Sequence, residues 1–144
     1  MELFLSYNHT AFHLEVRNLT SQKINLWSQK CSGGYYAFYF KVSSMADTKK
    51  ACFIRRKEIF WTVNIPSVDS VGANKSLTYN FHLHDKTWDL NECRIFKPGE
   101  EIKVSCILEI KSDEDTLDMN VLTGVFESNA IDFDSIQRIL THFN

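Results

Sequence analysis

The sequence predicts an all-β protein, an antiparallel β-sandwich that ends in a short C-terminal α-helix. Six or seven short segments carry apolar residues at every second position, as half-buried strands do. Turn and loop residues separate these segments, and only the C-terminal end changes to a helical spacing. Strands that follow one another without helices between them favour an antiparallel sandwich over a parallel α/β sheet.

The clearest strand covers residues 102–111, and a Pro98-Gly99 turn precedes it. Its alternate positions hold five apolar residues, Ile102, Val104, Cys106, Leu108 and Ile110. A strand with this many apolar residues on one face needs a second layer to bury them. The other expected strands are, in chain order, residues 12–17, 23–27, 35–43, 59–65, 77–84 and 119–126.

Two of these strands carry tyrosines whose faces matter for function. In residues 35–43, Tyr39 lies opposite the face that holds Phe38 and Phe40. In residues 77–84, Tyr79 shares its face with three apolar residues, Leu77, Phe81 and Leu83. The alternation therefore allows Tyr79 to be a core residue, whereas Tyr39 is expected on the outer face.

Charged stretches fill three of the connections. The basic segment 49–57 is expected to be a solvated loop or hairpin, and the acidic segment 112–118 a loop. Residues 85–90 form a turn that exposes or half-exposes Trp88. These connections leave the strands as the only long ordered segments before the C-terminal end.

The C-terminal end is expected to be an amphipathic helix. Asp134 and Gln137 match a capping box. Apolar residues then recur at helical spacing, namely Ile136, Ile139, Leu140 and Phe143. We divide the chain into a sandwich over residues 1–126 and a linker with this helix over residues 127–144.

Length and charge limit the classes of function. The 144 residues fit one domain that can bury a core without disulfides. The net charge is -2, so no basic footprint for nucleic acid or an anionic membrane is present. No apolar run has the length of a membrane span, and the first residues do not form a signal peptide. We expect an intracellular protein of the cytoplasm or nucleus.

The four cysteines are too scattered for a zinc module, and Cys106 is expected to be an inert buried thiol. Three Asn-X-Ser/Thr sequons begin at Asn8, Asn18 and Asn74. Without a signal peptide, we interpret these sequons as coincidental.

No catalytic constellation stands out, so we predict that the protein is not an enzyme. His82 and His84 share a strand face, but no third ligand is indicated, and no cofactor or metal is expected. Neither Cys93 nor Cys106 has a flanking motif for nucleophilic catalysis, and the sequence lacks phosphate-binding glycine motifs and the HExxH motif.

Aromatic residues are the feature that points to binding. The chain has 3 Trp, 5 Tyr and 11 Phe, which exceeds the evident need of one sandwich core. Tyr35, Tyr39 and Trp88 occupy positions where a ring can contact a partner while its polar end stays hydrated. A protein-binding module follows more naturally than a catalyst.

The segment Pro98-Gly-Glu-Glu-Ile-Lys-Val-Ser-Cys-Ile-Leu-Glu-Ile resembles the closing core strand of the TRAF-like (MATH) domain of speckle-type POZ substrate adaptors. Upstream, Tyr79-Asn-Phe followed by Lys86-Thr-Trp88 is similar to that family's Tyr, Phe and Lys-Asp-Trp segment. The resemblance covers about residues 12–111. It implies a sandwich that captures short Ser/Thr-rich peptides in a shallow groove, much as in strand addition.

Carried over by position, the resemblance implies a peptide-binding site of Tyr39, Tyr79, Lys86 and Trp88. The chain departs from the family at Thr87, Asp89 and Leu90, where the family has an acidic residue, a glycine and an aromatic residue. Because only eleven residues precede Phe12, the family's opening strands are expected to be missing. The sequence also contains no BTB/POZ domain, through which such adaptors recruit a ubiquitin ligase.

We therefore expect a module that captures an extended peptide of a partner protein, similar to the substrate-recognition domains of ubiquitin-ligase adaptors. Trp88→Ala is expected to abolish capture and leave folding intact. The first alternative is an immunoglobulin-like sandwich that mediates subunit assembly, with a homo-oligomer as its product and no peptide groove. The second is a small hydrolase or metal protein that uses His82 and His84.

Overall fold

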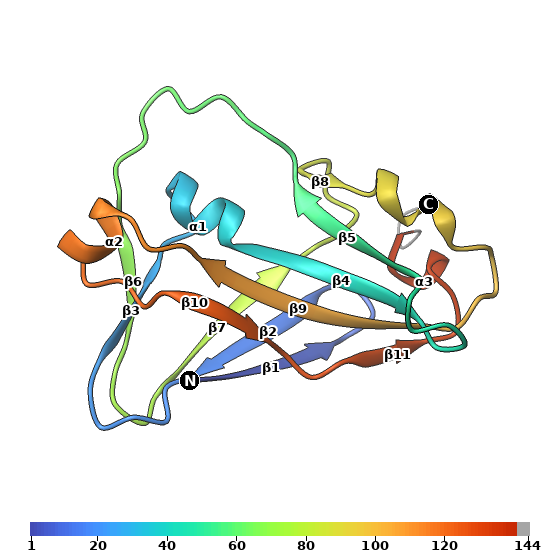
Figure 1. Ribbon diagram of the computed structural model, residues 1–144, viewed down its shortest axis with the longest axis horizontal. Helices are drawn as coiled ribbons and strands as arrows, with labels where there is room; N and C mark the ends of the chain where they lie inside the picture. Colours follow the sequence, from blue (N-terminus) through green and yellow to red (C-terminus); the bar gives the residue numbers. More distant parts are fainter. Residues whose placement is uncertain (141–144) are drawn as a thin grey trace.

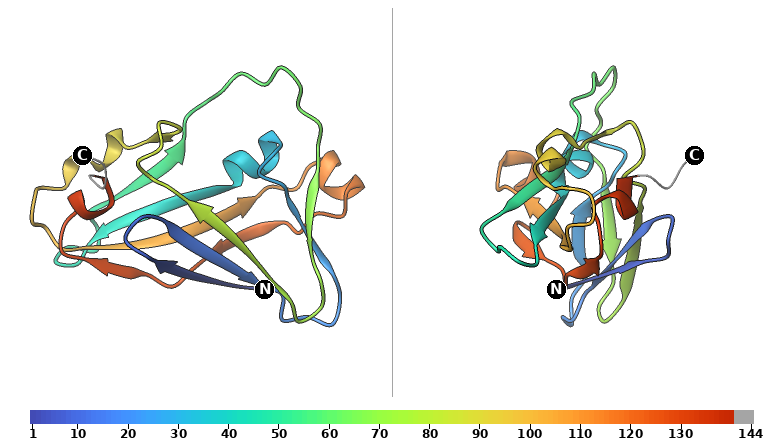
Figure 2. Two further views of the ribbon diagram at one scale, coloured as in Figure 1. Left: turned by 180° about the vertical axis from the view of Figure 1, so that it is seen from behind. Right: turned by 90° about the vertical axis from the view of Figure 1, so that its right-hand side faces the viewer.

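Antiparallel strands dominate the structure, a computed structural model that describes residues 1–140 (Figure 1). The smaller sheet has the strand order β1-β2-β7. Its strands are β1 (Glu2–Tyr7), β2 (Phe12–Arg17) and β7 (Ser76–Phe81). In Figure 2 (left) this sheet lies in front of the larger one.

The larger sheet has the order β10-β9-β4-β5-β8, and β11 pairs with β9 beside β10. Its strands are β4 (Phe38–Ser44), β5 (Ala51–Arg56), β8 (Trp88–Asp89), β9 (Ile102–Ile110), β10 (Gly124–Glu127) and β11 (Ile131–Phe133). The strand with the clearest sequence pattern, β9, is thus central and paired on both sides.

A two-stranded ribbon and four short helices complete the fold. The ribbon pairs β3 (Ile24–Trp27) with β6 (Val68–Val71). The helices are α1 (Ser32–Ala37), the 3₁₀-helix η1 (Asn91–Ile95), α2 (Glu114–Asp118) and α3 (Gln137–Leu140). No helix within residues 1–140 has the length and apolar character needed to cross a membrane.

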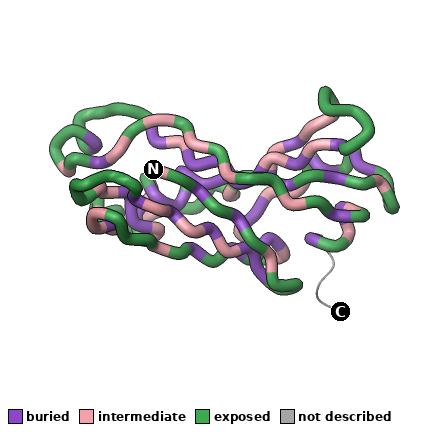
Figure 3. Tube along the Cα trace, turned by 90° about the horizontal axis from the view of Figure 1, so that it is seen from below, coloured by how far each residue is buried: buried purple, intermediate pink, exposed green. Residues whose placement is uncertain are grey.

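Aromatic rings fill the space between the two sheets. The ring centroids of Phe12 and Phe40 lie 5.1 Å apart, and those of Phe38 and Tyr79 lie 4.9 Å apart. These pairs join β2 and β7 to β4 across the interior, so the sheets form a sandwich with one core. Figure 3 shows the buried residues on the strands and the exposed ones along the connecting loops.

The predicted fold class is confirmed: the chain is an all-β antiparallel sandwich with a short C-terminal helix. Strand β2 matches the predicted 12–17, and β9 matches 102–111 within one residue. Helix α3 begins at Gln137, three residues after the predicted cap Asp134. Phe143 of the predicted helix lies outside the described residues.

Five local predictions are wrong. Residues 59–65 pair with no strand, and residues 35–37 belong to α1, so that β4 begins only at Phe38. The acidic segment contains α2, and the last predicted strand shortens to β10. The chain also has a strand before Phe12, since β1 pairs with β2 along its whole length.

The segment after residue 126, predicted as a linker and helix, packs on the sandwich. Strand β11 extends the larger sheet, and Ile136 and Ile139 are buried. The Asn129 side chain donates to the Leu5 carbonyl and accepts from the Leu5 amide, at 3.0 and 2.7 Å. Asn129 thereby satisfies backbone groups at the open edge of β1.

Candidate functional site

Trp88, the predicted principal anchor, lies in the core with 2% of its surface exposed. Its ring is 5.5 Å from that of Phe40 and 6.0 Å from that of Phe81. The prediction of an exposed or half-exposed Trp88 is wrong because the turn from Asp85 folds β8 back onto β5. That pairing directs the indole between the sheets, where a partner peptide cannot reach it.

Tyr79 is also buried, on the face that it shares with Phe81, as strand alternation allowed. Its hydroxyl donates to Asp69 Oδ2 at 3.2 Å. Burial, together with the charge of Asp69, raises the pKa of Tyr79 well above its usual value. Tyr79 is therefore a core tyrosine and not a groove residue.

Tyr39 lies on the opposite face of β4 from the core, as predicted, but other side chains cover its ring. The Arg55 guanidinium lies 4.0 Å from the ring centroid, and the hydroxyl donates to Glu109 Oε2 at 2.9 Å. Only 8% of Tyr39 is exposed. Tyr39 lines a cleft of about 370 Å³ that also contains Tyr36 and Arg55.

Lys86 is exposed in the turn before β8. The four predicted site residues therefore do not converge: Tyr79 and Trp88 lie between the sheets, Tyr39 outside the larger sheet and Lys86 in a turn. The rings of His82 and His84 lie 5.4 Å apart. Within residues 1–140, no group of three or more His, Cys, Asp or Glu side chains is placed to hold a metal ion.

The most unusual surface is the connection from β5 to β6, residues 57–67, which we call the exposed segment. It arches away from the sandwich in Figure 1. Phe60 is 89% exposed, and Val63 and Ile65 are each 70% exposed. Ile59, next to Phe60, is 43% exposed. Such a run of exposed apolar residues is uncommon on a monomeric protein.

Helix α1 holds the exposed segment in place. The Ile59 amide donates to the Tyr36 hydroxyl at 3.1 Å. The Asn64 side chain accepts from the Ser32 amide at 2.9 Å and donates to the Ser32 hydroxyl at 2.7 Å. The Trp61 ring meets the Tyr35 ring edge-on, 5.6 Å away. The apolar side chains are thus presented on a backbone that is fixed at several points.

Gly34 allows α1 to lie where it can make these contacts. A Cβ atom at this position would fall 2.0 Å from the Ser28 carbonyl oxygen. Only glycine permits this approach, which brings Tyr35 and Tyr36 beneath the exposed segment.

Two arginines stand where the exposed segment leaves β5. The Arg56 guanidinium stacks 3.9 Å over the Trp88 ring and lies 5.0 Å from the Tyr35 ring. It donates to the Thr87 hydroxyl, while its Nε is buried without a partner. Burial lowers the pKa of Arg56, since it removes water from the charged form. Arg55 and Arg56 line a hollow of about 420 Å³ with Tyr36, Glu58 and Ile59.

Carboxylates stand near the other end of the exposed segment. Asp113 and Asp115, at the start of α2, share a small hollow of about 110 Å³ with Asn64 and Pro66. The Asp113 side chain caps α2 by accepting from the Thr116 amide at 2.8 Å. The surface therefore has a basic end, an apolar middle and an acidic end.

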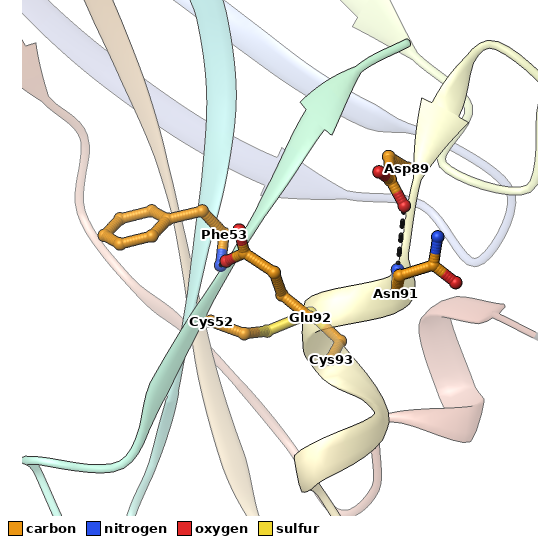
Figure 4. The surroundings of a disulfide bond; sticks show 6 residues. All are labelled: Cys52, Phe53, Asp89, Asn91, Glu92 and Cys93. Atoms are coloured by element: carbon orange, nitrogen blue, oxygen red, sulfur yellow. Dashed lines mark hydrogen bonds between the residues drawn. A yellow bond between two sulfur atoms is a disulfide. The ribbon is translucent and has the colours of Figure 1, made fainter.

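A disulfide fixes the strand from which the basic end projects. Cys52 of β5 is bonded to Cys93 of η1, and the Phe53 amide donates to Glu92 Oε2 at 3.1 Å (Figure 4). The Asn91 amide donates to Asp89 Oδ1 at 3.0 Å, which joins η1 to β8.

The predicted burial of Cys106 is confirmed, and burial raises the pKa of its thiol. The predicted location in the cytoplasm or nucleus stays a prediction.

One feature of the sequence indicates the exposed segment, and the prediction of a strand over residues 59–65 did not use it. Residues 59–61 are all apolar, so both faces of the expected strand carry large apolar side chains. Charged Lys57 and Glu58 and then Pro66 bracket the run. An edge strand of a sandwich buries one face, so a run that is apolar on both faces indicates an additional surface.

Comparisons of the chain with protein-family models, with curated proteins and with solved structures find no match. The resemblance to MATH domains therefore stays a prediction from the sequence.

Proposed function

We propose that the protein is a binding module without catalytic activity. Its exposed segment binds an extended segment of a partner protein. The site differs from the predicted one, since Trp88 and Tyr79 support the core. Tyr39 contributes indirectly by holding Arg55 beside the binding surface. A role as an adaptor of a ubiquitin ligase stays a prediction.

The observation that carries the proposal is the exposure of Phe60, Val63 and Ile65 on a segment that α1 fixes. Leaving large apolar side chains in water forgoes about 1.5–3 kcal/mol for each one that could be buried. Aromatic residues at the centre of such patches often dominate the free energy of protein association. A fixed segment also loses little conformational entropy on binding.

Unpaired backbone groups support an extended partner. Within the described part of the chain, no peptide group of residues 60–63 makes a hydrogen bond. These amides and carbonyls can bond to a partner chain, although the backbone bends at Thr62 and Val63, so the segment is not one continuous strand edge. Affinity would then come from main-chain pairing and from the apolar side chains that flank it.

Site-specific photocrosslinking in the native cell tests this function. We replace Phe60 with p-benzoylphenylalanine, irradiate, and identify the adducts by mass spectrometry. The expected result is a covalent adduct with a defined protein. Leu19, which is 64% exposed in the β2–β3 loop, is the matched control position. No adduct from position 60, or the same adducts from position 19, would show that the exposed segment binds no specific partner.

A further inference from the structure

We propose that the partner is a second copy of this chain, related to the first by a two-fold axis that passes near the middle of the exposed segment. This inference rests on the proposed binding function and specifies its partner. A two-fold dimer would combine the binding function with the alternative of subunit assembly. The segment that each copy binds is then the exposed segment of the other copy.

The arrangement of chemistry along the surface is the first reason. Arg55, Arg56 and Lys57 form the basic end, and Phe60 to Ile65 form the apolar middle. Asp113, Glu114 and Asp115 form the acidic end, beside Asn64 and Pro66. Figure 1 shows the exposed segment running from β5 to β6, with α2 next to its far end.

A surface of this kind is self-complementary under a two-fold rotation. In a two-fold dimer, each contact between one end of the surface and the other occurs twice. Rotation about the middle places the basic end of each copy against the acidic end of the other. The apolar middle then faces itself.

The second reason is that the charges at the two ends form no ion pairs within residues 1–140 of the single copy. Within residues 1–140, no carboxylate oxygen lies within 4.0 Å of a side-chain nitrogen of Arg55, Arg56 or Lys57. The carboxylates of the acidic end likewise form no ion pair within these residues. Other basic residues do form pairs, such as Lys50 with Glu100 at 2.7 Å. Asp85 acts on Arg56 electrostatically and Glu58 lines the same hollow, so Arg55 and Lys57 are the basic charges most available to the acidic end of a second copy.

The rigidity of the basic end strengthens this argument. Aromatic rings hold both guanidiniums, Arg55 over Tyr39 and Arg56 over Trp88. Arg56 is partly buried, so an incoming carboxylate beside it is less screened by water than one beside a solvated lysine. The acidic end of a second copy supplies such carboxylates together with Leu117, which is 73% exposed and extends the apolar area.

Sedimentation equilibrium of the purified chain, over about 1 to 200 µM, tests the proposal. The unaltered chain is expected to be a reversible dimer. Reversing the basic end (R55E with K57E) or the acidic end (E114K with D115K) should raise the dissociation constant at least about tenfold. Combining all four changes restores opposite charges across the axis and should return the constant to within about threefold of the original. Phe60→Ser should weaken the dimer whether or not the charge variants fold well.

A chain that is monomeric throughout this range overturns the proposal. A dimer that tolerates Phe60→Ser and both charge reversals overturns it too, because another surface must then form the contact. The photocrosslinking at position 60 separates this failure from failure of the binding function. An adduct with a different protein would retain the binding module and reject self-association, whereas a self-adduct supports both.

Discussion

Strand alternation predicts the positions of some side chains. The positions of others depend on tertiary contacts that the sequence does not show. Cys106 lies in the core, as the period of two along its strand indicated, and Tyr79, predicted as a site residue, lies there too, as that period allowed. Trp88 belongs to no long alternating run, so its sequence neighbours did not reveal its direction. Only the pairing of β8 with β5 determines that the ring points inward.

Tyr79 makes alkaline stability a test of the core at the scale of one residue. Burial first, and Asp69 second, raise the pKa of Tyr79 above its ordinary value of 10.0. The folded chain therefore holds this proton more tightly than the unfolded chain does. The resulting stabilisation is complete below pH 10 and is lost as the pH rises above 10 towards the folded-state value.

We expect the free energy of unfolding to fall as the pH rises above about 10, and to fall less steeply in Tyr79→Phe, which has no proton to lose. Urea unfolding at a series of pH values measures this difference. Equal slopes for Tyr79→Phe and the unaltered chain would contradict the buried, protonated Tyr79.

Whole strands were predictable where the local pattern and the pairing agree. Strand β9 has five apolar positions on one face and neighbours on both sides, so pattern and pairing give the same answer. Residues 59–65 have the same alternation but no neighbour, because β8 and η1 occupy the edge of β5. Local propensity cannot show which strands compete for one edge.

Residues 35–37 failed for a different reason. Their aromatic content favours a strand, yet the contact of Gly34 with the Ser28 carbonyl turns the chain into α1. That contact depends on the β3–α1 connection and not on the propensity of the residues themselves. The binding surface that the structure reveals depends on this same turn, since α1 holds the exposed segment.

The Cys52–Cys93 disulfide should stabilise the element pair that it joins. It closes a loop with a sequence separation of 41, and removing such a bond typically costs about 2–4 kcal/mol of folding free energy. We expect Cys52→Ala with Cys93→Ala to lower the free energy of urea unfolding by this amount. Dithiothreitol should lower that of the unaltered chain to a similar extent and leave the double variant unchanged. An unaltered chain that is insensitive to dithiothreitol would show that the bond does not contribute.

At the scale of the molecule, the aromatic residues serve two separate purposes. One set, which includes Phe12, Phe40, Phe81 and Trp88, joins the two sheets through ring contacts. The other set lies at the exposed segment, where Phe60 is 89% exposed and buries little area in the fold. The sequence indicated that the chain has more rings than a core needs, but the prediction placed Trp88 at the surface and gave Phe60 no role.

The division of the rings into a core set with Trp88 and a surface set with Phe60 is tested most directly by urea unfolding. The measurement compares Trp88→Ala with Phe60→Ala. Truncation of a fully buried Trp typically costs about 3–5 kcal/mol, so Trp88→Ala should lose stability in that range, contrary to the sequence-based expectation that it folds normally. Phe60→Ala should change the free energy of unfolding by less than about 0.5 kcal/mol. A small effect of Trp88→Ala, or a larger one of Phe60→Ala, would contradict the account.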